Sequence, residues 1–272
     1  MKKRDERLIQ KKKRLSNEYD SLFEKIVEIL IKYRTEVKDW NYSELKKYNR
    51  LVNFDKEISN LLRDFSKEEL EVVNEILVDE FKESWKETQS KIHKRKKMPE
   101  EKEIKKIVNY RNSNDGLSVE ERNKRNVDYL SYKIHGTVVK NSKESKDFDK
   151  LINQDLNNLK KNHVSKTSTR QLQDDITQAE SLGVMFLAAS LNGTYDDVYN
   201  TVVNGGDYAD VSQKKEIWML YYITAGDGRV CSSCLEREGN YYPADGSFSI
   251  PDNTHPNCRC ELLPELVEND FY

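Results

Sequence analysis

The chain has 272 residues, of which 36% are hydrophobic and 35% are charged, and its formal net charge is -2. Such polarity disfavours a compact all-β fold and favours helices with much solvated surface. No stretch approaches the roughly 18 consecutive apolar residues of a membrane helix, and the Lys-rich start lacks the apolar run of a secretory signal. We therefore expect no membrane-spanning segment and a protein that is cytosolic where it is made.

Helix breakers are scarce at the start of the chain, where no glycine precedes Gly116 and Pro99 is the only proline in that span. Long helices are the expected result. "SKEE" at Ser66–Glu69 predicts a helix start, because serine can cap the helix and a glutamate three residues later can reach back to the cap amide. Two apolar stripes at three- and four-residue steps predict helix packing within the chain: Leu22, Phe23, Ile26, Val27, Leu30, Tyr33 and Val37, then Ile58, Leu61, Leu62 and Phe65.

The middle of the chain alternates between polar linkers and helices. The basic run Lys91–Lys97 before Pro99 indicates a helix end or linker, and "SVEE" at Ser118–Glu121 predicts the next helix start. The most apolar stretch, Thr177–Leu191, predicts a core helix in which Gly183 allows close approach of a neighbour. Its expected buried face consists of Ile176, Ala179, Leu182, Gly183, Phe186 and Leu187.

The last segment changes character. Asn204–Asp210 contains paired glycines and predicts a turn, and Ile217–Thr224 is rich in aromatic and β-branched residues and predicts a short buried strand. Four prolines follow, so we expect loops and short strands that need a staple. The predicted fold is mainly α: an elongated helical region at 1–130, a helical core at 131–215 and a small α+β, zinc-stapled module at 216–272.

All four cysteines lie in this last segment. Cys231 and Cys234 form a C-x-x-C step, and His255, Cys258 and Cys260 follow in a second group. Soft ligands in two such groups are typical of a structural zinc site with four tetrahedral ligands. In a reducing compartment this pattern favours metal binding over disulfides, which are the alternative.

Only four of these five candidate ligands are needed, and the sequence leaves open which four bind. Either four cysteines bind and His255 stays outside, or one thiol is spared. A catalytic zinc keeps a position open to water, whereas here the ligands exceed four, so we expect a structural ion and no enzymatic activity.

The ordered residues of this segment resemble the signature of phage head morphogenesis proteins, the minor head proteins similar to the F protein of phage Mu and the minor capsid protein of phage SPP1. The resemblance spans Trp218–Cys260, and upstream of it the helical region from about Leu151 is similar only loosely. The matching residues are Trp218, Asp227, Arg229, Cys231, Cys234, Gly239, Pro251 and "HPNCRC" at His255–Cys260.

The resemblance implies a virion component in few copies, located in the head interior or at the portal vertex and added in the host cytoplasm during procapsid assembly. The implied partners are the portal and the capsid or scaffold proteins, with DNA as a further candidate through packaging or ejection, and no small-molecule substrate. From the residues themselves, we expect Asp227 and Arg229 to orient the first ligand loop by a salt bridge or turn cap. Arg259 is expected to offset thiolate charge.

Two alternatives remain at this stage. An HNH-type nuclease also sets C-x-x-C pairs around a histidine, but it needs a second ligand or base beside that histidine, and His255 has no such neighbour. We expect His93, His135 and His163 to be exposed. The other alternative is a DNA-binding adaptor that contacts phosphates through the basic segments Met1–Arg14 and Lys91–Lys97.

Overall fold

The computed structural model describes residues 2–111, 115–211 and 215–268. The chain is 68% helix and 7% strand, with one three-stranded antiparallel sheet near its C-terminal end, which confirms the predicted fold class. Contacts divide the chain into two compact units, and the long helices α3 (Arg50–Lys91) and α8 (Thr169–Asn192) contribute to both. The division at residues 130 and 215 stays a prediction. Among the described residues, no helix has the length and apolarity needed to cross a membrane.

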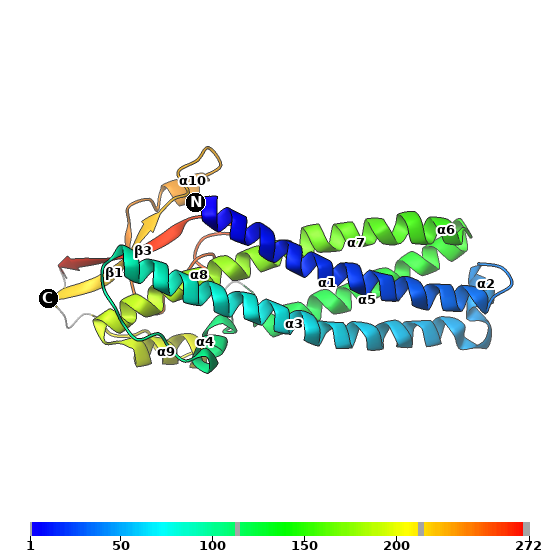
Figure 1. Ribbon diagram of the computed structural model, residues 1–272, viewed down its shortest axis with the longest axis horizontal. Helices are drawn as coiled ribbons and strands as arrows, with labels where there is room; N and C mark the ends of the chain where they lie inside the picture. The colour runs from blue at the N-terminus through cyan, green and yellow to red at the C-terminus, as the bar shows by residue number, and fades with distance from the viewer. Residues whose placement is uncertain (1, 112–114, 212–214, 269–272) are drawn as a thin grey trace. The chain divides into compact units, whose positions relative to one another are not determined.

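Unit 1 comprises residues 1–73 and 120–172, and its described elements of regular structure are all helices (Figure 1). The basic segment at the chain start is helical from Lys2 onward, and Met1 lies outside the described residues. Besides the first part of α3 and the start of α8, its elements are α1 (Lys2–Thr35), α2 (Tyr42–Lys46), η1 (Lys47–Asn49), α5 (Val119–Glu144), α6 (Phe148–Lys150), η2 (Leu151–Leu156), α7 (Asn157–His163) and η3 (Val164–Ser168).

The apolar stripe of α1 forms part of the core of unit 1, as predicted, because its three- and four-residue spacing places those side chains on one face. The helix start predicted at Ser66 is wrong, since α3 runs through this position without a break. The Ser66 hydroxyl donates to the Asn123 side chain, and Glu69 accepts hydrogen bonds from Tyr19 and Asn123. The two side chains of the apparent capping box therefore bond residues that are distant in the sequence and do not cap a helix.

These contacts belong to a buried polar network in the core of unit 1. The Tyr19 hydroxyl donates to Glu69 Oε1 at 2.7 Å and accepts from the Ser168 hydroxyl at 2.8 Å, and Asn123 Nδ2 donates to Glu69 Oε2 at 3.0 Å. The His163 ring packs against Tyr19 with centroids 5.4 Å apart. His163 is only 3% exposed, so the expectation that it is exposed is wrong, because its helix turns this residue into the core.

Unit 2 comprises residues 74–119 and 173–272. In the segment predicted as a turn, Asn204–Asp210, the first residue is the last of a helix, and the remaining residues have no regular structure. The elements of unit 2, besides its parts of α3 and α8, are α4 (Glu101–Val108), α9 (Tyr195–Asn204), β1 (Glu216–Ile223), α10 (Ser232–Leu235), β2 (Tyr241–Pro243) and β3 (Glu261–Glu268).

Helix α8 is the central helix of unit 2, and its apolar stretch is buried on nearly all sides, which is typical of a core helix. Gly183 lies against α3, as predicted: a Cβ at this position would be 2.8 Å from the carbonyl oxygen of Phe81 and 3.2 Å from Cβ of Ser84. The absent side chain therefore sets how closely the two helices approach.

Replacement of Gly183 by alanine is expected to destabilise unit 2 by about 2 kcal/mol, because the new methyl group meets backbone that cannot move aside. Urea unfolding followed by the fluorescence of Trp85 and Trp218 measures this loss. Gly136→Ala on α5 is the matched control, since nothing lies within 4 Å of its added Cβ. Equal stabilities of the two variants would contradict the close approach.

The sheet has the order β2-β1-β3, with β1 in the centre. β1 confirms the strand predicted at Ile217–Thr224 and pairs along its whole length with β3, from Glu216 opposite Glu268 to Ile223 opposite Glu261. Pro264 is tolerated in β3 because this strand lies at the sheet edge. Asn192 at the end of α8 binds both backbone groups of Trp218, at 2.8 and 2.9 Å, and so fixes β1 to the core helix.

Candidate metal centre

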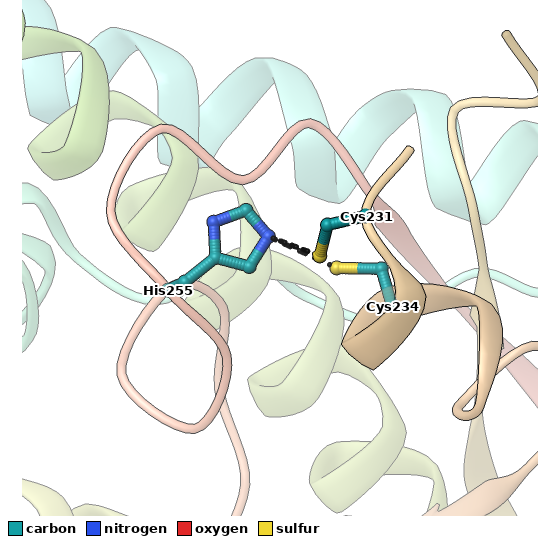
Figure 2. A group of neighbouring side chains, drawn as sticks. All are labelled: Cys231, Cys234 and His255. Atoms are coloured by element: carbon teal, nitrogen blue, oxygen red, sulfur yellow. Dashed lines mark hydrogen bonds between the residues drawn. The ribbon is translucent and has the colours of Figure 1, made fainter. Parts of the chain in front are cut away.

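The first ligand segment is the single turn of helix α10. Cys231 is its N-cap, and the backbone amides of Cys234 and Leu235 donate to the Cys231 carbonyl at 3.1 and 3.0 Å. In a helical turn, residues three positions apart lie on the same side. The C-x-x-C spacing therefore brings the side chains of Cys231 and Cys234 close together. Figure 2 shows both sulfurs on the side that faces His255.

The second ligand segment is the loop that leads into β3. The Cys258 amide donates to the His255 carbonyl at 3.2 Å, and Asn257 has a left-handed backbone with φ 60, which closes a tight turn. The amide of Asn257 also donates to the carboxylate of Asp174 on α8. Upstream in the loop, the amide of Ile250 donates to the Ser181 hydroxyl of α8 at 2.9 Å, so the core helix holds this segment at two points.

The predicted ligands meet in two overlapping groups. One group contains Cys231, Cys234 and His255, the other contains Cys234, Cys258 and Cys260, and within each group the ligand atoms lie within 4.8 Å of one another. His255 Nε2 is 3.2 Å from the sulfur of Cys231 and 3.1 Å from that of Cys234 (Figure 2). The sulfurs of Cys234 and Cys258 are 3.8 Å apart. Cys234 is the member that the two groups share.

The separation between the sulfurs of Cys234 and Cys258 suits a tetrahedral ion. Sulfur ligands at about 2.3 Å from a metal in tetrahedral geometry are about 3.8 Å from each other. The sulfurs of Cys234 and Cys258 have this separation, which is also far too long for a disulfide. All four cysteines are free, and Cys234, Cys258 and Cys260 are buried while Cys231 is exposed.

The ring of His255 is oriented for ligation through Nε2. Its Nδ1 lies 2.9 Å from the carbonyl oxygen of Pro256. Because a carbonyl oxygen can only accept, Nδ1 carries the proton, and the lone pair of Nε2 faces the two sulfurs in the neutral ring. The hydrogen bond to Pro256 also raises the pKa of His255 above its ordinary value.

The thiols differ in how readily they ionise. A hydrogen bond from Cys260 lowers the pKa of Cys258 to about 4, whereas the same contact raises the pKa of Cys260. The backbone amide of Cys234 lowers the pKa of Cys231, and burial raises the pKa of Cys234. Like charges this close cannot all ionise unaided, so a cation is the element that would allow several thiolates to coexist.

An ion pair joins the two ligand segments. Asp227 lies just before the first segment, and its two carboxylate oxygens accept from the guanidinium of Arg259, between Cys258 and Cys260, at 2.7 Å each. Asp227 also accepts from the amide and side chain of Arg229 at 2.9 and 3.2 Å, which is the predicted turn cap and salt bridge. The hydrogen bond from Arg259 holds the pKa of Asp227 far below its usual range. Arg259, expected to offset thiolate charge, thus has an acidic partner as well.

Replacing Asp227 with asparagine is expected to weaken metal binding about tenfold, because the two ligand segments lose their charged clamp while every ligand remains. Competition with a chromophoric chelator measures the dissociation constant. Asp197→Asn, an exposed charge loss in the first turn of α9, serves as the control. If both variants bind metal as tightly as the wild type, the clamp has no role in the site.

All five predicted ligand residues thus lie in the two groups, and among the described residues His255 is the only histidine in a group that could hold a metal ion. The sequence analysis missed Asp174, which anchors the second loop, and Tyr222, whose hydroxyl lies among the sulfurs. The signal for Tyr222 was its place in a buried strand, because the hydroxyl of a buried tyrosine needs a partner.

Comparison of the chain with protein-family models, curated proteins and solved structures finds no match. The chemistry of this centre therefore follows from its own donor atoms and distances. Four thiols and one imidazole converge on a small volume, and together they could hold a metal ion.

Proposed function

We propose that the cluster holds a structural zinc ion and that the protein is a phage minor head protein that acts in head morphogenesis at or near the portal. Sulfur and imidazole donors favour zinc over magnesium or calcium, which prefer oxygen ligands. More than four soft ligands in one place suit a closed structural site rather than one that keeps a position for water.

The observation that carries the proposal is that most residues of the phage-like signature lie in or beside the metal centre. Asp227, Cys231, Cys234 and the "HPNCRC" stretch are separate in the sequence and adjacent in space. Matching residues that come together in one compact centre support the resemblance more strongly than matching residues dispersed over the fold. The ion would fix the α10 turn and the His255 loop against the sheet, so that unit 2 presents a defined surface to a large assembly. The proposed partners are the portal and the capsid or scaffold proteins, with DNA as a further candidate.

The test is to purify heads and procapsids from the host that carries the gene and to identify their proteins by mass spectrometry. We expect the chain in few copies per particle, and we expect particles made without it to be defective in DNA packaging or delivery. Its absence from purified particles, while the portal protein is present, would overturn the assignment. Incorporation of a Cys234→Ser chain tests whether the metal centre is needed for assembly.

A further inference from the structure

The hydroxyl of Tyr222 lies inside the cysteine cluster. It donates a hydrogen bond to the sulfur of Cys234 at 3.2 Å and is 3.7 Å from the sulfur of Cys258. Tyr222 is 0% exposed, so water does not serve this hydroxyl from the surface. A polar group so deeply buried is costly unless it makes a good hydrogen bond.

A neutral thiol is a weak acceptor and would be a poor partner for such a hydroxyl. A metal-bound sulfur is a thiolate, whose negative charge makes it a much stronger acceptor. The contact between Tyr222 and Cys234 is therefore suited to the metal-loaded form of the cluster. Donors of this kind, one step removed from the ion, commonly tune a metal site.

The backbone of β1 fixes Tyr222 independently of the cluster. Its amide donates to the Asn240 carbonyl, its carbonyl accepts from the Gly239 amide, both at 3.0 Å, and it lies opposite Leu262 of β3. Its ring makes edge contacts with Phe248 and with a tyrosine of β2. The hydroxyl is thus aimed at the sulfurs by strand pairing and ring packing.

Cys234 is the sulfur to which this donor matters most. It belongs to both ligand groups and is the residue that links them. It is also 1% exposed, so neighbouring protein groups rather than solvent must stabilise its charge.

We propose that Tyr222 is a positioning residue of the metal centre, whose hydroxyl donates to the metal-bound sulfur of Cys234 and stabilises its thiolate. This inference rests on the proposed metal site. No bond to the metal is made by Tyr222 itself. Its role is to orient Cys234 and to withdraw charge from its sulfur.

The test compares Tyr222→Phe with Tyr221→Phe in the full-length protein. Both changes remove one hydroxyl from β1, but successive side chains of a strand point to opposite faces. We expect Tyr222→Phe to raise the zinc dissociation constant about tenfold in chelator competition. With cobalt in place of zinc, its sulfur-to-metal charge-transfer band should move to longer wavelength, because a thiolate that loses a hydrogen bond is a better electron donor.

An unchanged affinity and an unchanged cobalt band in Tyr222→Phe would overturn the inference while leaving the metal site in place. A wild-type protein that binds neither zinc nor cobalt would overturn both. A weaker affinity with an unchanged band would show a packing role and contradict the hydrogen bond to Cys234. If Tyr222→Phe does not fold, wild-type protein loaded with a spin-active cadmium isotope gives the answer: coupling between the Tyr222 hydroxyl proton and cadmium is expected, and its absence contradicts the proposal.

Discussion

Replacing Cys234 with serine is expected to abolish tight metal binding and to loosen the region from α10 to β3, while the helices stay folded. Cys234 belongs to both ligand groups, so its loss removes the residue that links them. Structural zinc contributes an apparent binding free energy of about 10–16 kcal/mol in small zinc modules. Most of this stabilisation of the C-terminal region would be lost.

Three measurements check this result: metal content after gel filtration, limited proteolysis of the C-terminal region, and far-ultraviolet circular dichroism for the helices. Ser232→Ala is the matched control, because it changes an exposed side chain of the same turn. His255→Ala and Cys260→Ser, measured alongside, show whether each of these residues is a ligand. A Cys234→Ser protein that keeps its metal at wild-type affinity would contradict the shared role of this sulfur.

The second large effect concerns pH and unit 1. Burial raises the pKa of Glu69 to about 7, although hydrogen bonds from Tyr19 and Asn123 act in the opposite direction. Because the folded state binds this proton more tightly than the unfolded state, the stabilisation is complete below the unfolded pKa of 4.5 and is lost as pH rises through about 7. A difference of this size corresponds to about 3 kcal/mol. The contribution of Glu69 to the stability of unit 1 should therefore be markedly smaller at pH 8 than at pH 5.5.

Glu69→Gln should remove this alkaline loss, because glutamine keeps a hydrogen-bonding side chain without a titratable group. Urea unfolding, followed by the fluorescence of Trp40 at a series of pH values, measures the slope of the unfolding free energy against pH. Glu68→Gln, an exposed change on the same helix, should keep the wild-type slope. Identical slopes in all three proteins would show that Glu69 is ionised in the core at no cost.

His163 adds a loss of stability on the acid side. Burial lowers its pKa from 6.5 to about 4. The folded state therefore disfavours the charged ring, so the stabilisation is complete above the unfolded pKa and is lost as pH falls from 6.5 toward 4. With Glu69 acting in the opposite direction, unit 1 is expected to be most stable at mildly acidic pH.

Local patterns predicted most of the helices and the central strand. The stripe of α1 and the apolar run of α8 follow from residue spacing alone, and the scarcity of glycine and proline before Gly116 predicts the long helices. The start predicted at Ser66 failed because Glu69 bonds residues some 50 positions away in the chain. A capping box can be recognised from the local sequence. The distant residues that bond its side chains instead cannot be recognised in that way.

The same limit applies to the metal centre. Spacing pointed to the five candidate ligand residues that the structure brings together, because C-x-x-C and the His255 segment fold into local turns. Spacing could not identify Asp174 or Tyr222, whose contacts with the site depend on how α8 and β1 pack against the loops. The choice of ligands depends on the same packing, which places Cys234 at the centre of both groups.

The most direct test of the central claim is native mass spectrometry of the full-length protein, prepared under reducing conditions with zinc present, followed by alkylation of its thiols. We predict about one zinc ion per chain and cysteines that resist alkylation until the ion is chelated. A metal-free protein whose four native thiols are all alkylated without chelator would contradict the account.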